Sequence, residues 1–183
     1  MQSVNNRIIV RVNMSQKNEM LIGDVLVKAA LIYNTNYREK SPVIAQVVSG
    51  NDKLKEGMLI CCHHNHFYEP SPYFLEDNLY SIPYNKTIFG YFTNDGELIP
   101  ICDNVLGSRI KVPSNIPLPP ELVETYKNKV LVTNGHGTKY KKGEIIFTRP
   151  SAPYDIVYNW GNKEHIITKV SGDMIVGYKS VSD

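Results

Sequence analysis

The sequence predicts an all-β protein with two small domains of one fold in tandem. One pattern occurs twice, at Val43 to Ile60 (VIAQVVSGNDKLKEGMLI) and at Val130 to Phe147 (VLVTNGHGTKYKKGEIIF). Each copy has an apolar strand, a glycine, a lysine-rich turn, a second glycine and another apolar strand, which is typical of a β-hairpin. A second pair of segments follows at a comparable distance, YSIPYNKTIFGY ending at Tyr91 and HIITKVSGDMIVGY ending at Tyr178. Two matched segments in the same order indicate an internal repeat.

The composition is that of an ordinary folded protein. The chain has 183 residues, of which 42% are hydrophobic and 21% charged, so each half can bury a core. A formal charge of +2 is too weak for a general phosphate-backbone binder, because such binding scales with the number of Lys and Arg facing the phosphates. We therefore expect no nucleic-acid partner.

The chain carries no pattern of a membrane or secreted protein. No apolar run approaches the ~20 residues that span a bilayer. The start, MQSVNNRIIVRVN, lacks the long apolar segment of a secretion signal. Three cysteines, two of them adjacent, make a poor disulfide framework. We expect a cytoplasmic protein without a membrane partner.

In the first half, alternation of apolar and polar residues predicts an opening strand at Asn6 to Val12. The stretch LIGDVLVKAALIY allows a strand at Asp24 to Lys28 or a short helix through VLVKAALIY, and we favour the strand. The turn Asn94, Asp95, Gly96 has hairpin chemistry, since these residue types tolerate left-handed conformations. Further strands are predicted at Leu79 to Ile82, Thr87 to Phe92 and Glu97 to Ile101.

The domain boundary is predicted near Asp103, which gives domains at residues 1–102 and 103–183. The segment DNVLGSRIKV there has the place that NRIIVRV has in the first half. Short strands with turns at regular spacing favour a small barrel or a sandwich in each half. The remaining strands are predicted at Asp155 to Trp160, His165 to Val170 and Met174 to Tyr178.

These segments resemble the chaperonin-10 (GroES) co-chaperonin family. Its fold is a small β-barrel with an opening strand, an excursion that docks on the chaperonin, a hairpin with a lysine-rich turn, and a closing strand. NRIIVRV and DNVLGSRI look like the opening strand, VIAQVVSG with LKEGMLI and KVLVTNG with YKKGEIIF like the hairpin, and KTIFGY and GDMIVGY like the closing strand. The resemblance implies two tandem GroES-like β-barrels with long loops.

The resemblance also implies where a partner would dock. Family members carry a mobile loop in which a glycine pair precedes a short aliphatic tripeptide, and neither half reproduces that motif. The aliphatic stretches at the matching places are LIGDVLV and IPLP. The residues that would dock a partner are Met20, Leu21, Ile22, Val25, Leu26, Val27, Ile116 and Leu118.

The densest group of reactive side chains comes directly after the first hairpin. If the strand continues, Cys62, His64 and His66 share one face and could begin a zinc site. Structural zinc sites usually take four ligands from two separated segments, so packed and hydrogen-bonded side chains explain this group better than a metal does. Because no paired carboxylates, nucleophile triad or phosphate loop stands out, we expect no enzyme and no cofactor.

Two functions remain for such a chain. The first is a non-catalytic assembly protein that joins or decorates a larger protein assembly through strand edges and loop tips, such as an auxiliary capsid component of a phage virion. The second is a divergent, phage-encoded co-chaperonin that caps a host chaperonin in the host cytoplasm. A fused pair of barrels does not tile the seven-membered ring of that family, which favours the first. Both functions predict an oligomeric protein with protein partners.

Overall fold

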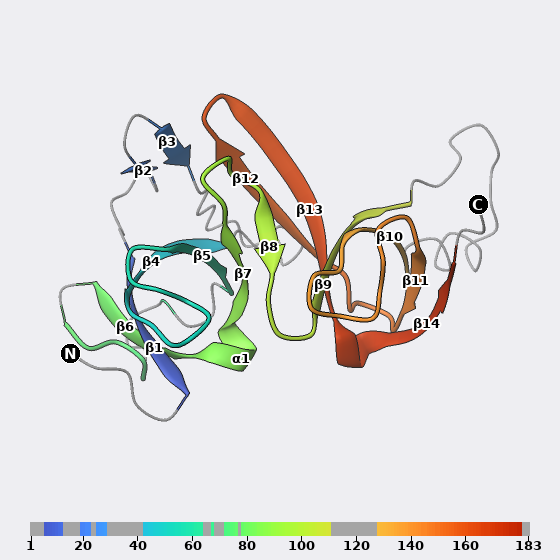
Figure 1. Ribbon diagram of the computed structural model, residues 1–183, viewed down its shortest axis with the longest axis horizontal. Coiled ribbons are helices and arrows are strands. Elements are labelled where there is room, and N and C mark those ends of the chain that lie inside the picture. Colours follow the sequence, from blue (N-terminus) through green and yellow to red (C-terminus); the bar gives the residue numbers. More distant parts are fainter. Residues whose placement is uncertain are drawn as a thin grey trace. The chain divides into compact units, whose positions relative to one another are not determined.

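The computed structural model shows an all-β protein (Figure 1). Its strand pairs are antiparallel and form two sheets. Two single helical turns, α1 (Tyr84–Thr87) and η2 (Gly172–Met174), each precede a strand. The structure describes residues 6–12, 42–63, 67, 72–76, 78–110 and 128–180. For residues 19–22 and 25–28 it describes the backbone alone.

The first sheet has six strands and the second has eight. The first, in spatial order, consists of β6 (Leu79–Pro83), β1 (Arg7–Arg11), β4 (Val43–Ser49), β5 (Leu59–Cys62), β7 (Ile88–Phe92) and β8 (Leu98–Pro100). The second consists of β14 (Ile175–Lys179), β11 (Ile145–Thr148), β10 (Lys129–Asn134), β9 (Asn104–Arg109), β13 (Lys163–Ser171), β12 (Tyr154–Trp160), β3 (Val25–Lys28) and β2 (Glu19–Ile22).

The strands predicted from the sequence are confirmed. The opening strands of the two halves are β1 and β9, and the two lysine-rich patterns form the hairpins β4–β5 and β10–β11. Of the strand predicted at Asp24 to Lys28, the part Val25–Lys28 is confirmed as β3, and the helical alternative is wrong for these four residues; Asp24 lies outside the described residues. Gly96 takes a φ of 80° in the predicted turn before β8. Local alternation and turn residues thus sufficed to locate the strands.

The chain forms two compact units, and one of them is discontinuous in sequence. The first unit comprises residues 1–101 together with 156–165, and the second comprises residues 102–155 and 166–183. The tip of the β12–β13 hairpin is therefore part of the first unit, although it belongs to the second half of the sequence. The division into domains at residues 1–102 and 103–183 stays a prediction.

Five strands of each unit pair in the same order. In the first unit the order is β6-β1-β4-β5-β7, and in the second it is β13-β9-β10-β11-β14. The shifts in register also coincide. The pairing of β1 with β4 skips Val48, and that of β9 with β10 skips Thr133. The pairing of β5 with β7 skips Phe89, and that of β11 with β14 skips Val176. An extra residue bends a strand locally, so the two units share their bends as well as their order.

The two lysine-rich turns share one hydrogen-bond pattern. The Gly57 N–H donates to the Val47 carbonyl oxygen, and the Gly143 N–H donates to the Val132 carbonyl oxygen, both with 2.9 Å between nitrogen and oxygen. Gly57 and Gly143 have φ of 86° and 93°, which is the left-handed region that glycine enters most readily. The second glycine of each turn, Gly57 or Gly143, is therefore required by the left-handed backbone at that position.

The first glycine of each turn lies against the returning backbone. A Cβ on Gly50 would overlap the carbonyl oxygen of Leu54, and a Cβ on Gly135 would overlap that of Tyr140. Because these neighbours are backbone atoms, they cannot rotate away as a side chain would. Close backbone approach thus explains the position of both glycines.

Alternate strand residues form the core of each unit. In the second unit, the buried residues Val105, Val130, Val132, Ile146 and Val170 form one apolar cluster. In the first unit the largest fully buried side chains are Tyr80, Tyr158, Ile8, Leu54, Ile60, Ile82, Ile88, Leu98, Ile156 and Val10. Tyr158 and Ile156 come from the hairpin tip, so that tip completes the core of the first unit.

Replacing Gly50 or Gly135 by alanine should lower the free energy of unfolding by roughly 1–3 kcal/mol, because the added Cβ forces the turn backbone to shift. Gly57→Ala has open space around the Cβ and should cost roughly 1–2 kcal/mol through its left-handed φ alone. Urea-induced unfolding measures both. Lys53→Ala, at an exposed turn residue, serves as the control and should change stability by less than about 0.5 kcal/mol. Equal effects at Gly50 and Lys53 would contradict this account of the turn.

Candidate docking surface

The predicted docking residues of the first half lie in a two-stranded hairpin. Its strands β2 and β3 pair Met20 with Val27 and Ile22 with Val25. The β3 strand also pairs with β12. These strands contain Met20, Leu21, Ile22, Val25, Leu26 and Val27, whose side chains lie outside the described structure. Ile116 and Leu118 lie outside the described residues altogether.

The predicted metal ligands do not form a described site. Cys62 is the last residue of β5 and is fully buried. Burial raises the pKa of both the Cys61 and the Cys62 thiol, so both stay protonated, whereas a reactive or metal-bound cysteine needs its thiolate. His64 and His66 lie outside the described residues. Within the described part of the chain, no three His, Cys, Asp or Glu residues lie close enough to hold a metal ion.

The tip of the β12–β13 hairpin carries an aromatic cluster that packs within the first unit. Trp160 stacks on Phe92 with ring centroids 5.4 Å apart. It also lies so close to Gly96 that a Cβ there would overlap the indole. Tyr158 donates a hydrogen bond from its hydroxyl to the Gly96 carbonyl oxygen at 3.2 Å. His165 stacks on Tyr158 with centroids 4.9 Å apart. These contacts anchor the tip.

Titration of this cluster agrees with a packing role. Burial raises the pKa of Tyr158 to about 12, and Cys61 and Glu97 contribute to the rise. Burial, followed by the charge of Lys163, lowers the pKa of His165. Both shifts favour the neutral rings, which pack without a counter-ion.

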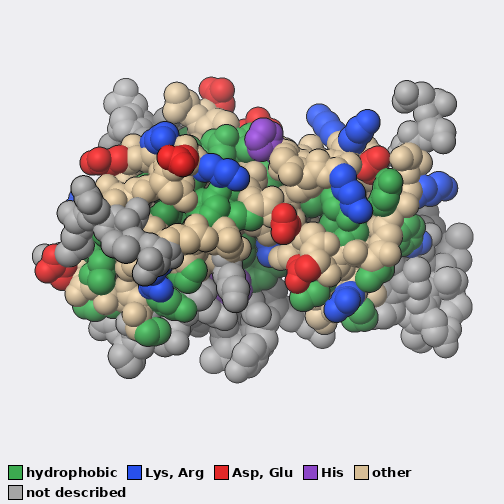
Figure 2. Space-filling model, turned by 60° about the horizontal axis from the view of Figure 1, so that its bottom comes forward, with side chains coloured by type: hydrophobic (Ala, Val, Ile, Leu, Met, Phe, Trp, Pro, Cys, Tyr) green, Lys and Arg blue, Asp and Glu red, His purple; other side chains and the backbone are tan. Residues whose placement is uncertain are grey.

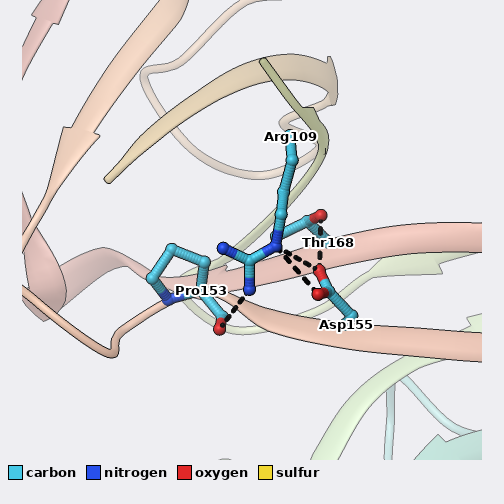
Figure 3. A network of polar contacts seen from close by, with 4 residues as sticks. All are labelled: Arg109, Pro153, Asp155 and Thr168. Carbon is cyan, nitrogen blue, oxygen red and sulfur yellow. Dashed lines mark hydrogen bonds and ion pairs between the residues drawn. The ribbon is translucent and has the colours of Figure 1, made fainter. Parts of the chain in front are cut away.

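A polar network ties the base of the β12–β13 hairpin to β9 in the second unit (Figure 3). Arg109 Nε donates to both Asp155 carboxylate oxygens at 2.9 and 2.8 Å, and Nη2 donates to the Pro153 carbonyl oxygen at 3.1 Å. The Thr168 hydroxyl donates to Asp155 Oδ1 at 2.8 Å. The two charged side chains are 40% and 38% exposed, so the ion pair contributes at most about 1 kcal/mol.

Both units place a cation beside a serine hydroxyl next to the opening strand. In the first unit Arg7 Nε donates to Ser81 Oγ at 2.9 Å. In the second, Lys169 Nζ donates to Ser171 Oγ at 2.6 Å. Ser81 pairs with Ile9 in β1, and Lys169 pairs with Leu106, the residue of β9 that matches Ile9. Ser81 and Lys169 are therefore equivalent. The two pairs are therefore alike in chemistry but not in position, since the position of the serine in the first unit is that of the lysine in the second.

The outer edge of β14 differs from the equivalent edge in the first unit. There, β8 pairs with β7, and the Ile101 N–H donates to the Phe89 carbonyl oxygen at 3.2 Å. In the second unit β14 ends the strand order, so no described strand pairs with its outer side. The equivalent side chains differ accordingly, because Phe89 is 2% exposed whereas Val176 is 64% exposed. Among the described residues, a strand thus covers this apolar edge in the first unit, and none covers it in the second.

Tyr178 extends this exposed edge. Its ring is 52% exposed and meets the ring of Tyr140 edge-to-face, with centroids 5.7 Å apart. The ammonium group of Lys139 lies over both rings, 5.4 and 5.9 Å from their centroids. The edge therefore combines apolar surface with positive charge. We call Val176, Gly177, Tyr178 and Lys179 the β14 edge.

On the face shown in Figure 2, Lys and Arg side chains are interspersed with Asp and Glu. No helix among the described residues is long and apolar enough to span a bilayer.

The β14 edge is not among the docking residues predicted from the sequence. Its residues lie in the closing segment GDMIVGY, which the sequence predicts as a strand, and the strand pattern carries no signal for which neighbours that strand has.

Comparisons with known proteins do not identify a family for this chain. No family model matches the chain, and no curated protein matches it. The function therefore has to be argued from the geometry.

Replacing Gly96 by alanine should displace the indole of Trp160, because the added Cβ overlaps that ring and φ at this position is positive. Since the chain has one tryptophan, its fluorescence reports on the hairpin tip alone. We expect a red-shifted emission and a lower melting temperature. Tyr158→Phe keeps the ring and loses its hydroxyl bond, and it should cost about 1 kcal/mol with little change in emission. Unchanged emission in Gly96→Ala would refute this packing.

The pKa of Lys169 predicts a pH dependence of stability. Burial lowers this pKa from 10.5 to about 8, although Asp173 opposes the shift. Between pH 8 and 10.5 the unfolded chain then binds more protons than the folded chain, so this lysine makes stability rise with pH in that window. Lys169→Met should therefore gain stability relative to the wild type near pH 7 and lose that advantage by pH 10.5. Urea midpoints at several pH values test this, and a constant difference between the two proteins would contradict it.

Proposed function

We propose that this chain is a non-catalytic assembly protein, in which two GroES-like barrels join or decorate a larger protein assembly. A phage virion, with the chain as an auxiliary capsid component, is the setting we propose. Two units with one strand pairing pattern and different exposed edges support this function, because each unit can present a different contact to neighbouring subunits. The partners are other protein subunits, and the proposal involves no cofactor or nucleic acid.

The exposed β14 edge is the observation that carries the proposal. Single exposed apolar residues are normal on a folded protein, but an apolar strand edge is a template for pairing with another chain, and no described strand covers this one. Val176 is 64% exposed and Tyr178 is 52% exposed. An edge of this kind is costly to leave uncovered because it favours aggregation, so a partner that covers it gives a reason for its apolar residues.

One observation favours a co-chaperonin as a second candidate. The β2–β3 hairpin lies between β1 and β4 in sequence, which is where the excursion that docks on the chaperonin occurs in the family the sequence resembles. Its strands contain the aliphatic residues predicted to dock. Under this alternative, the chain caps a host chaperonin through the hairpin, and docking is governed by the nucleotide state of the chaperonin.

Sedimentation distinguishes the two functions. As an assembly protein, the full chain should form multi-subunit species that grow with its concentration, and it should not sediment with a bacterial chaperonin in either the presence or the absence of ADP. ADP-dependent sedimentation with the chaperonin would instead establish the co-chaperonin. A chain that stays monomeric at every concentration would contradict assembly through its own edges.

A further inference from the structure

We infer that the β14 edge binds an extended segment of a partner protein, in which an acidic residue precedes alternating apolar residues. The inference rests on the proposed function and names the chemistry of the partner. Its template is inside the molecule, because β8 already occupies the equivalent edge in the first unit. The residues that would receive the segment are the four of the edge, Val176, Gly177, Tyr178 and Lys179.

The pairing of β8 with β7 shows how such a segment would bind. Gly90 lies opposite Pro100, and Tyr91 lies opposite Ile99. The Ile101 N–H donates to the Phe89 carbonyl oxygen, and the Thr93 N–H donates to the Glu97 carbonyl oxygen at 2.9 Å. Phe89 corresponds to Val176, because each is the residue that the pairing skips, and Tyr91 corresponds to Tyr178, because both pair at the equivalent position of the hairpin strand. The matching groups of β14 therefore point away from β11.

A glycine shared by the two edges points to a strand at close range. At Gly90 an added Cβ would overlap the carbonyl oxygen of Ile99, so β8 can approach only because no side chain is present. At the equivalent Gly177, the nearest described atom is a ring carbon of Phe147, 3.9 Å from an added Cβ. Among the described residues, the second unit thus leaves room for a side chain at Gly177. A strand bound as β8 is bound would need that residue to be glycine.

Charge identifies the start of the partner segment. In the register of β7 and β8, Leu98 lies opposite Phe92, whose equivalent in the second unit is Lys179. Glu97, which precedes Leu98, would then lie opposite Ser180, and alternation along the strand puts its side chain on the face of Tyr178, not on that of Lys179. The ammonium group of Lys139 lies 5.9 Å from the centroid of the Tyr178 ring, and the Glu144 carboxylate at the same end already accepts hydrogen bonds from the Ser180 hydroxyl and the Lys141 N–H. An acidic residue at that end of the bound strand would be attracted to Lys139.

The apolar part of the partner would cover the side chains that the second unit leaves exposed. Phe89 is 2% exposed at the edge where β8 lies, whereas Val176 is 64% exposed. Burying Val176 and Tyr178 under a strand gives both a hydrophobic gain and a backbone ladder, as in other cases of strand addition to a sheet edge. The segment Glu97-Leu98-Ile99-Pro100-Ile101 meets this description and provides the probe.

The test uses the full chain and a fluorescein-labelled peptide of residues 96–101, Gly-Glu-Leu-Ile-Pro-Ile, with binding measured by fluorescence anisotropy. We expect saturable binding that weakens at high salt. Gly177→Ala should lower the affinity at least tenfold while leaving the melting temperature unchanged, since its Cβ meets no described atom closer than 3.9 Å. The same peptide N-methylated at Ile101 lacks the donor that bonds to Phe89 in the first unit and should also lose binding.

Leu131→Ala is the matched control. It removes an apolar side chain that is 39% exposed on β10, a strand with neighbours on both sides. Binding lost equally in Leu131→Ala and Gly177→Ala would show non-specific adsorption and overturn the inference. Wild-type protein that does not bind the peptide, yet forms multi-subunit species in sedimentation, would overturn this partner chemistry and leave the assembly function standing. Wild-type protein that neither binds the peptide nor forms multi-subunit species would overturn both this inference and the assembly function.

Discussion

Each unit depends on a backbone contact that leaves no room for a side chain. The first glycine of the lysine-rich turn, Gly50 or Gly135, lies against a carbonyl oxygen of the returning chain. The second glycine then takes a left-handed conformation and bonds back to the first strand. These two constraints fix the pairing of the hairpin strands, and the pairing decides which residues face the core. The core of the second unit, centred on Val130 and Ile146, results from that register.

One strand pairing pattern has produced two different surfaces. The closing strand of each unit carries the same shift in register and an equivalent glycine, Gly90 or Gly177. In the first unit the chain continues into β8 and covers the edge, whereas in the second the described residues leave it exposed. The difference among the described residues therefore lies in the strand beside the closing strand and not in the five shared strands. A duplicated fold can gain a contact surface in this way without changing its core.

The sequence predicted the features that depend on neighbouring residues. Alternation and turn glycines placed β4, β5, β10 and β11, because strand pattern and turn chemistry are local. Residues 156–165 could not be assigned to the first unit, since that depends on Trp160 meeting Gly96, far away in sequence. The Cys62 interpretation assumed a strand that continued, yet β5 ends at that residue. Exposure at Val176 depends on which strands lie beside it, which a single strand pattern does not record.

The hairpin tip has a consequence for the order in which the chain acquires its structure. Ile156 and Tyr158 are fully buried in the first unit, but they are synthesised after most of the second half. During translation, residues 1–101 emerge with part of their core missing, and they remain incomplete until the β12–β13 tip has left the ribosome. The first unit is therefore completed only shortly before the second, which still needs β14. A genetic cut between the halves would separate the first unit from part of its own interior.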